Sequence, residues 1–215
     1  ELADWVSYEL TVDEVYGSEA TRTDKFEEDP SITTGSATQA DYRKSGYDRG
    51  HLAPAADMKF SKQAMKDCFL FSNMSPQVPA FNRGIWGDLE AMVRYWAMKE
   101  GAVFVVTGPV LDKREYPTIG PNKVTVPDRF YKVILDYRKP TIKAIAFILD
   151  NSEQAQSIAA SARSVDEAER ITGIDFYPQI PDTLESEIES SFDIKDWPLI
   201  QFSLAKFPRT QATEE

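Results

Sequence analysis

The sequence predicts an α+β fold in which a central, mainly antiparallel sheet is flanked by helices. Apolar residues make up 42% of the 215 residues, which is enough for a substantial core. Strand-like and helix-like segments are mixed along the chain without the regular alternation that a parallel sheet requires. Because no linker or internal repeat interrupts the pattern, we expect one domain over residues 1–215.

The first part of the chain predicts one strand, one long loop and one short helix. Residues 5–10 alternate between apolar and polar side chains, which is typical of a strand. Residues 17–46 are rich in Gly, Ser, Thr, Asp and Pro and predict a loop. A loop of that length within a domain is more often functional than idle. Residues 61–69 predict a short helix with Ser61 as its N-cap.

The strongest helical pattern covers residues 82–99. Its apolar side chains recur at spacings of three and four and form one stripe, made of Ile85, Leu89, Met92, Val93 and Trp96. Asn82 lies at the start of this helix. Gly101 lies just beyond its end, where a glycine commonly terminates a helix.

The remainder predicts three strands and two further helices. The apolar run 102–107 indicates a buried strand, and residues 130–137 and 141–149 indicate a hairpin. Residues 164–173 indicate a short helix, because a Ser and a Glu three residues apart have capping-box spacing and a Gly follows. Residues 182–192 indicate one more helix.

Net charge is unevenly distributed. The chain carries −11, which argues against a nucleic-acid partner, because such partners usually meet a basic face. However, residues 150–197 hold twelve acidic and three basic residues, so −9 of this charge lies there and −2 elsewhere. Six basic residues surround the histidine and form either a local basic cleft or ordinary solvated surface charges: Arg43, Lys44, Arg49, Lys59, Lys62 and Lys66.

Membrane and redox signals are weak. No stretch approaches roughly eighteen apolar residues, so we expect no transmembrane helix and no membrane partner. The chain begins at Glu1 without Met or a leader. We therefore expect a processed or truncated N-terminus and favour a secreted or periplasmic location, with an organelle as the alternative. The single Cys68 leaves no internal disulfide and no cysteine zinc site, and we expect it to be a small buried apolar side chain.

His51 is the only histidine, within Asp48-Arg49-Gly50-His51. Histidine alone has an unperturbed pKa close to neutrality, so His51 is the obvious candidate for a proton acceptor. Arg49 can pair with phosphate oxygens through its planar guanidinium. Phosphodiester hydrolysis requires an attacking water, a base, a cation and help for the leaving oxygen. His51 can supply the base of this reaction, and the alternative is that it is a hydrogen-bonded structural residue.

Asn82 and Glu90 offer oxygen ligands on the predicted helix. Mg²⁺ prefers oxygen ligands and keeps several waters, so few protein ligands suffice. Each residue also has a structural alternative. An Asn near a helix start is usually a cap. Glu90 and Arg94, four residues apart, usually form an exposed ion pair.

Taken together, three segments resemble the DNA/RNA non-specific endonuclease family, which has a ββα-metal active site. They are Asp-Arg-Gly-His at 48–51 (the DRGH motif), Phe-Ser-Asn-Met-Ser-Pro-Gln at 71–77, and Asn82 followed by Glu90 and Arg94. Weaker similarities at residues 5–10, 22–29, 107–109 and 164–176 extend the resemblance over nearly the whole chain.

The resemblance implies a role for each matched residue. His51 would be the general base that deprotonates water, with activity rising near pH 6.5. Asn82 would be the one direct protein ligand of Mg²⁺, with Mn²⁺ or another divalent ion as alternatives. Glu90 would hold the water shell of the metal, and Arg49 would lie at the phosphate.

Three further residues would support this site. Arg94 would steady it, Asn73 would support the orientation of the histidine, and Arg22 matches the upstream phosphate-binding arginine of the family. The implied activity is cleavage of DNA and RNA to 5′-phosphate and 3′-hydroxyl ends. A homodimer and an inhibitor or immunity protein are further candidate partners. The alternative is a catalytically weak binding or interaction module on the nuclease fold, with its acidic C-terminal region against a basic partner.

Overall fold

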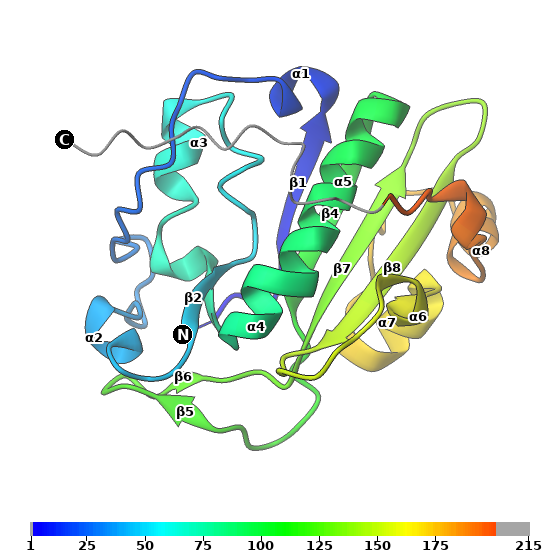
Figure 1. The fold of residues 1–215 in the computed structure, drawn as a ribbon. Coiled ribbons are helices and arrows are strands. Elements are labelled where there is room, and N and C mark those ends of the chain that lie inside the picture. Colours follow the sequence, from blue (N-terminus) through cyan, green and yellow to red (C-terminus); the bar gives the residue numbers. More distant parts are fainter. Residues whose placement is uncertain (1, 201–215) are drawn as a thin grey trace.

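The structure, a computed structural model, describes residues 2–200. Its centre is a five-stranded sheet with the order β1-β4-β7-β8-β9, in which every neighbouring pair is antiparallel (Figure 1). This confirms the predicted α+β class. The strands are β1 (Val6–Thr11), β4 (Ala102–Pro109), β7 (Arg129–Asp136), β8 (Lys143–Asp150) and β9 (Ala162–Arg163). The single domain expected over residues 1–215 stays a prediction.

Both faces of this sheet are buried, because side chains alternate between them along each strand. On β7, Phe130 and Ile134 pack in the core beneath the long helix α5 (Gly87–Glu100). Tyr131 and Val133 pack in a second core beneath α7 (Val165–Thr172) and α8 (Asp182–Glu189). The protein therefore has a helix layer on each side of the sheet, and Figure 1 shows α5 apart from α7 and α8.

Several local predictions are confirmed. β7 and β8 pair from Arg129↔Asp150 to Asp136↔Lys143, which is the predicted hairpin. The helix α3 (Lys62–Asp67) begins at Ser61, whose hydroxyl accepts a hydrogen bond from Ala64 N at 3.3 Å. Cys68 is buried, as expected.

Glycines end two helices where the sequence predicted. Gly101 has φ +87° after α5, and Gly173 has φ +72° after α7. Both angles lie in the left-handed region, which glycine adopts without steric cost. At the start of α7, Ser164 accepts from Glu167 N at 3.2 Å, but the Glu167 carboxylate pairs with Arg163 at 3.3 Å instead of completing the capping box.

The helix predicted over residues 82–99 is wrong in its first turn. A short α4 (Pro79–Phe81) leads into a π-helical turn, η2 (Asn82–Trp86), before α5 begins. Within η2, Gly84 has φ −103° and ψ −115°, which is not helical. Glycine permits this break because it has no Cβ. Turns of the π type are frequent at functional sites.

The long loop predicted over residues 17–46 contains the short helix α2 (Gln39–Tyr42) and one isolated bridge, from Glu27 to Leu70. Two small sheets lie outside the central one: β2 (Asp48–His51) with β3 (Met74–Gln77), and β5 (Thr118–Ile119) with β6 (Val124–Thr125). The remaining short helices are α1 (Val12–Val15), η1 (Phe71–Asn73), α6 (Ile158–Ser161) and η3 (Ile194–Asp196). Across residues 2–200, no helix has both the length and the apolar character needed to cross a membrane.

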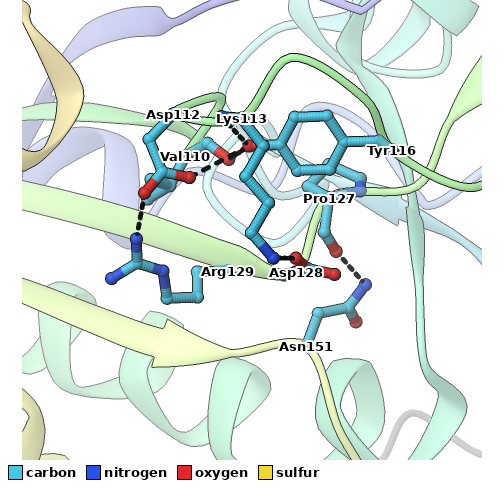
Figure 2. A network of polar contacts seen from close by, with 8 residues as sticks. All are labelled: Val110, Asp112, Lys113, Tyr116, Pro127, Asp128, Arg129 and Asn151. Carbon is cyan, nitrogen blue, oxygen red and sulfur yellow. Dashed lines mark hydrogen bonds and ion pairs between the residues drawn. The ribbon is translucent and has the colours of Figure 1, made fainter.

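Asn151 attaches the β2–β3 hairpin to the central sheet. Its Oδ1 accepts from Val78 N at 2.7 Å, and its Nδ2 donates to Pro76 O at 3.1 Å and to Pro127 O at 2.9 Å. Figure 2 shows Asn151 beside a polar network formed by segments 110–116 and 127–129. In that network Arg129 pairs with Asp112, Lys113 pairs with Asp128, and Tyr116 donates to Val110 O. The hairpin therefore has a fixed position relative to β7 and β8.

Candidate active site

Two antiparallel strands and a following helix bring the predicted residues together. In the β2–β3 hairpin, His51 lies opposite Met74 and Asp48 lies opposite Gln77. Gly50 is required between them, because a Cβ there would lie 2.1 Å from the side chain of Gln77. The chain then continues through η2 into α5, which carry Asn82 and Glu90.

These elements border a cavity of about 890 Å³. Five of the seven predicted site residues line it: Arg22, Arg49, His51, Asn82 and Glu90. Arg94 and Asn73 are not among the lining residues. The cavity has the volume of an ordinary ligand pocket.

The His51 ring is enclosed by aromatic side chains. Only 8% of the residue is exposed. The ring meets Phe69 edge to face at 4.8 Å between centroids, and Phe26 lies at 6.0 Å. His51 Nε2 is buried and has no hydrogen-bond partner in the part of the chain that the structure describes. The alternative of a hydrogen-bonded structural histidine therefore has no support.

This environment keeps the imidazole neutral. Burial, followed by the positive charge of Arg22, lowers the pKa of His51 from 6.5 to about 3, while Asp24 acts in the opposite direction. The structure therefore places the pKa far below the value near 6.5 that the sequence suggested. A neutral imidazole at pH 7 is the form that can accept a proton.

Asp48 fixes the orientation of the Asn82 amide. Asn82 Nδ2 donates to Asp48 Oδ2 at 2.9 Å. An ionised carboxylate only accepts hydrogen bonds, so the NH₂ group must face it. Asn82 Oδ1 then points elsewhere, and it has no hydrogen-bond partner within residues 2–200. The interpretation of Asn82 as a helix cap is wrong, because its side chain binds Asp48 and no helical N–H.

Asp48 is held in turn by Arg83, which the sequence did not identify. Arg83 binds both carboxylate oxygens, through Nε at 2.8 Å and Nη2 at 2.6 Å. Burial alone would raise the pKa of Asp48, but hydrogen bonds from Arg83 and Asn82 outweigh it and lower the pKa. Asp48 is therefore an anion that holds two side chains in place.

Glu90 lies at the inner end of the cavity above a buried lysine. Burial raises the pKa of Glu90, and the charges of Lys132 and Arg94 oppose this rise. Lys132 is fully buried, and its Nζ donates to Thr107 Oγ1 at 3.1 Å and lies 4.5 Å from the centre of the Trp86 ring. Burial lowers the pKa of Lys132, and the Glu90 charge opposes this. The two groups therefore favour each other's charged forms.

Arg94 forms an ion pair with Asp57, a residue that the sequence did not identify. Arg94 Nη1 lies 2.7 Å from Asp57 Oδ1, and Tyr8 donates to the other oxygen at 2.9 Å. The Asp57 side chain is fully buried and that of Arg94 is 21% exposed. The exposed Glu90–Arg94 pair considered from the spacing is therefore wrong. Arg94 joins α5 to β1 and to the segment after His51.

Asn73 holds the backbone that follows His51. Its Oδ1 accepts from Ala53 N at 2.9 Å, and its Nδ2 donates to Ala53 O at 2.9 Å and to Cys68 O at 2.8 Å. The backbone carbonyl of Asn73 also accepts from Leu52 N at 3.0 Å. These contacts agree with the expected positioning role.

Arg22 and Arg49 line the same cavity as the histidine, and, beyond burial, the charge of each lowers the pKa of that histidine. The guanidinium of Arg22 lies 5.2 Å from the Phe69 ring centre, and that of Arg49 lies 4.0 Å from the Phe26 ring centre. Stacking on aromatic faces holds a guanidinium while leaving its N–H groups available. Arg22 also binds Asp24 at 2.7 Å, and Arg49 binds Gln39 at 2.6 Å.

The predicted basic cluster is only partly at the cavity. Of its six members, Arg43 and Arg49 line the cavity, and the four lysines do not. Arg22 and Arg83 complete a set of four arginines there. Three carboxylates, Asp24, Asp48 and Glu90, also line the cavity, so the local charge is close to balance.

Lys132 and Asp57 were both missed in the sequence, although Lys132 carries a signal there and Asp57 does not. Lys132 interrupts the apolar run Phe130 to Leu135, and a charge inside a buried strand indicates a special environment. Asp57 lies in an ordinary loop segment and had no such signal. Its partner Arg94 is 37 residues away, so only the folded chain shows the pair.

A histidine on a pair of antiparallel strands and an asparagine in the turn before a helix, both lining one cavity, define a ββα class of site. The family profile described as DNA/RNA non-specific endonuclease matches residues 1–183. The chain belongs to this family.

Named relatives agree with this assignment. The chain is 36% identical over 189 residues to mitochondrial endonuclease G of Homo sapiens, covering 82% of this chain and 64% of that protein. It is 38% identical over 182 residues to mitochondrial nuclease 1 of Schizosaccharomyces pombe, covering 75% and 56%. It is 33% identical over 205 residues to a nuclease of Nostoc sp., covering 89% and 72%. The chain thus spans less than two thirds of these two mitochondrial relatives.

The fold is also found in a solved structure. A chain in the crystal structure of the EndoG/EndoGI complex matches with a TM-score of 0.78 and 32% sequence identity, over 84% of this chain and 80% of that chain. The arrangement of the central sheet and its helices is therefore that of the family.

Proposed function

We propose that this protein is a magnesium-dependent endonuclease that hydrolyses phosphodiester bonds in both DNA and RNA and leaves 5′-phosphate ends. The observation that carries the proposal is a neutral His51 and an oriented Asn82 on the same cavity. The relatives named as nucleases support the same reaction.

His51 acts as the general base. Because Nε2 is enclosed, Nδ1 is the ring nitrogen able to reach a water molecule in the cavity. A base with a low pKa is unprotonated over the whole neutral range. Asn73 keeps the backbone after His51 in place, which fixes the ring relative to the cavity.

Asn82 and Glu90 fit a hydrated divalent ion. Asn82 supplies a neutral amide oxygen, because its NH₂ group is bonded to Asp48, and Glu90 supplies a carboxylate on the same cavity. This small all-oxygen set matches Mg²⁺, which keeps most of its waters, and Mn²⁺ is an alternative. A bound ion would stabilise the negative charge that develops on the phosphate. Asn82 would contact it directly, and Glu90 would hold its waters.

The arginines bind the substrate. Arg49 and Arg22 present guanidinium groups beside His51, where a phosphate would meet the base. Arg94 contributes by positioning, because its pair with Asp57 fixes the helix that carries Glu90. None of these contacts reads a base, which agrees with cleavage of both DNA and RNA.

The test compares His51→Ala and Asn82→Ala with the unmodified protein on plasmid DNA and on RNA, with and without Mg²⁺. Both variants are expected to lose cutting while their circular dichroism is unchanged. Lys59→Ala is the matched control, because this exposed lysine belongs to the predicted basic cluster but does not line the cavity. Cutting by His51→Ala at the rate of the control would refute the assigned base. Absence of cutting by the unmodified protein with any divalent ion, while a basic partner co-purifies, would favour the binding-module alternative.

Partners and location follow the relatives. An inhibitor protein is the favoured partner, because the similar solved structure is an EndoG/EndoGI complex that concerns inhibition. A homodimer is the proposed oligomeric state. An organelle is the proposed location, since relatives are named mitochondrial. The secreted or periplasmic location favoured from the sequence has no such support.

A further inference from the structure

A second acidic cluster lies on the face of the sheet opposite α5. Asp166 and Glu169 of α7 and Glu189 of α8 each place a carboxylate oxygen within 4.8 Å of the other two. Figure 1 shows α7 and α8 on the other side of the molecule from β2 and α2, which border the active-site cavity. The cluster is therefore separate from Asn82 and Glu90.

Glu189 is the unusual member of this cluster. Only 4% of the residue is exposed, and its Oε1 is buried without a hydrogen-bond partner among residues 2–200. It is also the last residue of α8, and no basic residue occupies that last turn. The carbonyl end of a helix carries partial negative charge, which is unfavourable for a carboxylate. A buried carboxyl group in such a position either keeps a proton or is paired with a cation.

Residues 2–200 supply no such cation. None of the ion pairs found within the described residues includes Asp166, Glu169 or Glu189. Burial first, and then the charges of four neighbouring carboxylates, raise the pKa of Glu189 to about 8. Those neighbours are Glu169, Glu185, Asp166 and Asp175. The largest charge effects on Glu189 therefore all come from carboxylates.

The ligand atoms indicate the type of ion. All three are carboxylate oxygens that lie within 4.8 Å of one another, which suits a hard divalent cation. Ca²⁺ accepts a flexible, irregular set of oxygens at about 2.3–2.6 Å, whereas Mg²⁺ demands near-ideal octahedral geometry at about 2.0–2.1 Å, so we favour Ca²⁺ for this set. One oxygen of Glu169 already accepts from Phe176 N at 2.7 Å, which fixes that side chain and leaves its second oxygen for a ligand.

We propose that Asp166, Glu169 and Glu189 form a structural Ca²⁺ site that joins α7 to α8. Waters would complete the coordination on the exposed side, where Asp166 lies. Both helices pack on the outer core of the sheet through residues such as Val165 and Ile188. An ion between them therefore stabilises this helix layer and takes no part in hydrolysis.

The test uses thermal unfolding and calorimetric titration of chelator-treated protein with CaCl₂ alone. A site filled at about 100 times its Kd is expected to raise the Tm by roughly 5–10 °C in a chain of this size. Glu189→Gln should abolish both the calcium heat and the Tm rise, while its nuclease activity in Mg²⁺ stays unchanged. Glu187→Gln is the matched control, because it removes the same charge from an exposed position on the same helix.

Asn82→Ala separates this site from the proposed catalytic metal. The calcium response should persist in that variant, even though it is expected to lose nuclease activity. Absence of calcium binding to the unmodified protein would overturn the proposal, as would an equal response in Glu189→Gln. A calcium response that disappears with Asn82→Ala would also overturn it, because the ion would then be bound in the catalytic cavity.

Discussion

Lowering the pH from 8 to 5 should destabilise the protein through His51 in particular. In the folded chain the pKa of His51 is about 3, against 6.5 for a free histidine. Because the folded pKa is depressed, the unfolded chain takes up a proton on His51 at a higher pH than the folded chain does. The contribution of the neutral imidazole to the free energy of unfolding is therefore complete above pH 6.5 and is lost as the pH falls toward 3. pH 5 lies about 1.5 units below the pKa of His51 in the unfolded chain, so the free energy of unfolding falls by about 2 kcal/mol.

The measurement is urea unfolding of the unmodified protein and of His51→Gln at both pH values. Glu90, Lys132 and Glu189 also have shifted pKa values, but they are present in both proteins, and their titration largely cancels in the difference. The stability difference between the two proteins should shrink by about 2 kcal/mol between pH 8 and pH 5. A difference that is the same at both pH values would refute the burial argument.

Nuclear magnetic resonance gives an independent check, because the chain has one histidine and therefore one imidazole spectrum. Its ring protons should not shift in the folded protein between pH 8 and pH 5, whereas a midpoint near 6.5 would contradict the structure. The same depressed pKa moves the acid limb of nuclease activity below the pH 6.5 expected from the sequence.

Three substitutions test the supporting residues. Asp48→Ala releases the Asn82 amide and should raise the Mg²⁺ concentration for half-maximal activity by about 10- to 100-fold, measured by metal titration, since partners that orient a ligand have effects of that size. An unchanged metal dependence would show that Asp48 does not orient the ligand. Asp57→Asn leaves the mostly buried Arg94 without its anion and should lower unfolding free energy by about 3–5 kcal/mol in urea; a loss below about 1 kcal/mol would mean that Arg94 is solvated. Asn73→Ala leaves buried backbone groups unpaired and should reduce both stability, by on the order of 3 kcal/mol, and kcat. In that variant the metal dependence should stay constant, and a change in it would place Asn73 at the metal instead.

The sequence predicted those parts of the fold that depend on neighbouring residues. The hairpin of β7 and β8 follows from two apolar runs with a turn between them. The ends of α5 and α7 follow from Gly101 and Gly173, because a left-handed residue favours glycine wherever it occurs. In each case the information lies within a few residues of the feature.

The break at Gly84 could not be predicted in this way. The apolar stripe that begins at Ile85 continues smoothly into α5, so its period is that of one uninterrupted helix. The π-helical turn instead depends on distant contacts. Asp48 binds both Asn82 and Arg83 from 34 and 35 residues away, and Trp86 packs on Lys132 of β7.

For the site, the sequence identified five residues that border the cavity and also Arg94 and Asn73, which do not. It missed Arg83 at the cavity and Asp57 behind it. His51 and Asn82 belong to recognisable local patterns, whereas Asp57 acquires its role only when Arg94 and Tyr8 meet it in the folded chain. The neutral state of His51 is a further tertiary property. It results from Phe26, Phe69 and Arg22, none of which adjoins the histidine in sequence.

Charge also has to be considered by location. The acidic segment 150–197 includes α7 and α8, on the face of the sheet away from α5, and four arginines line the cavity on the other side. A polyanion is repelled by the first region, whereas the cavity is close to neutral because three carboxylates offset its four arginines. The uneven charge therefore favours approach of the substrate to the cavity over approach to the acidic segment. Four arginines at the cavity can contact only a few phosphates. The dependence of substrate binding on salt should therefore reflect these arginines and not the net charge of −11. An acidic isoelectric point is therefore compatible with a nuclease when most of its excess negative charge lies in segment 150–197, away from its site.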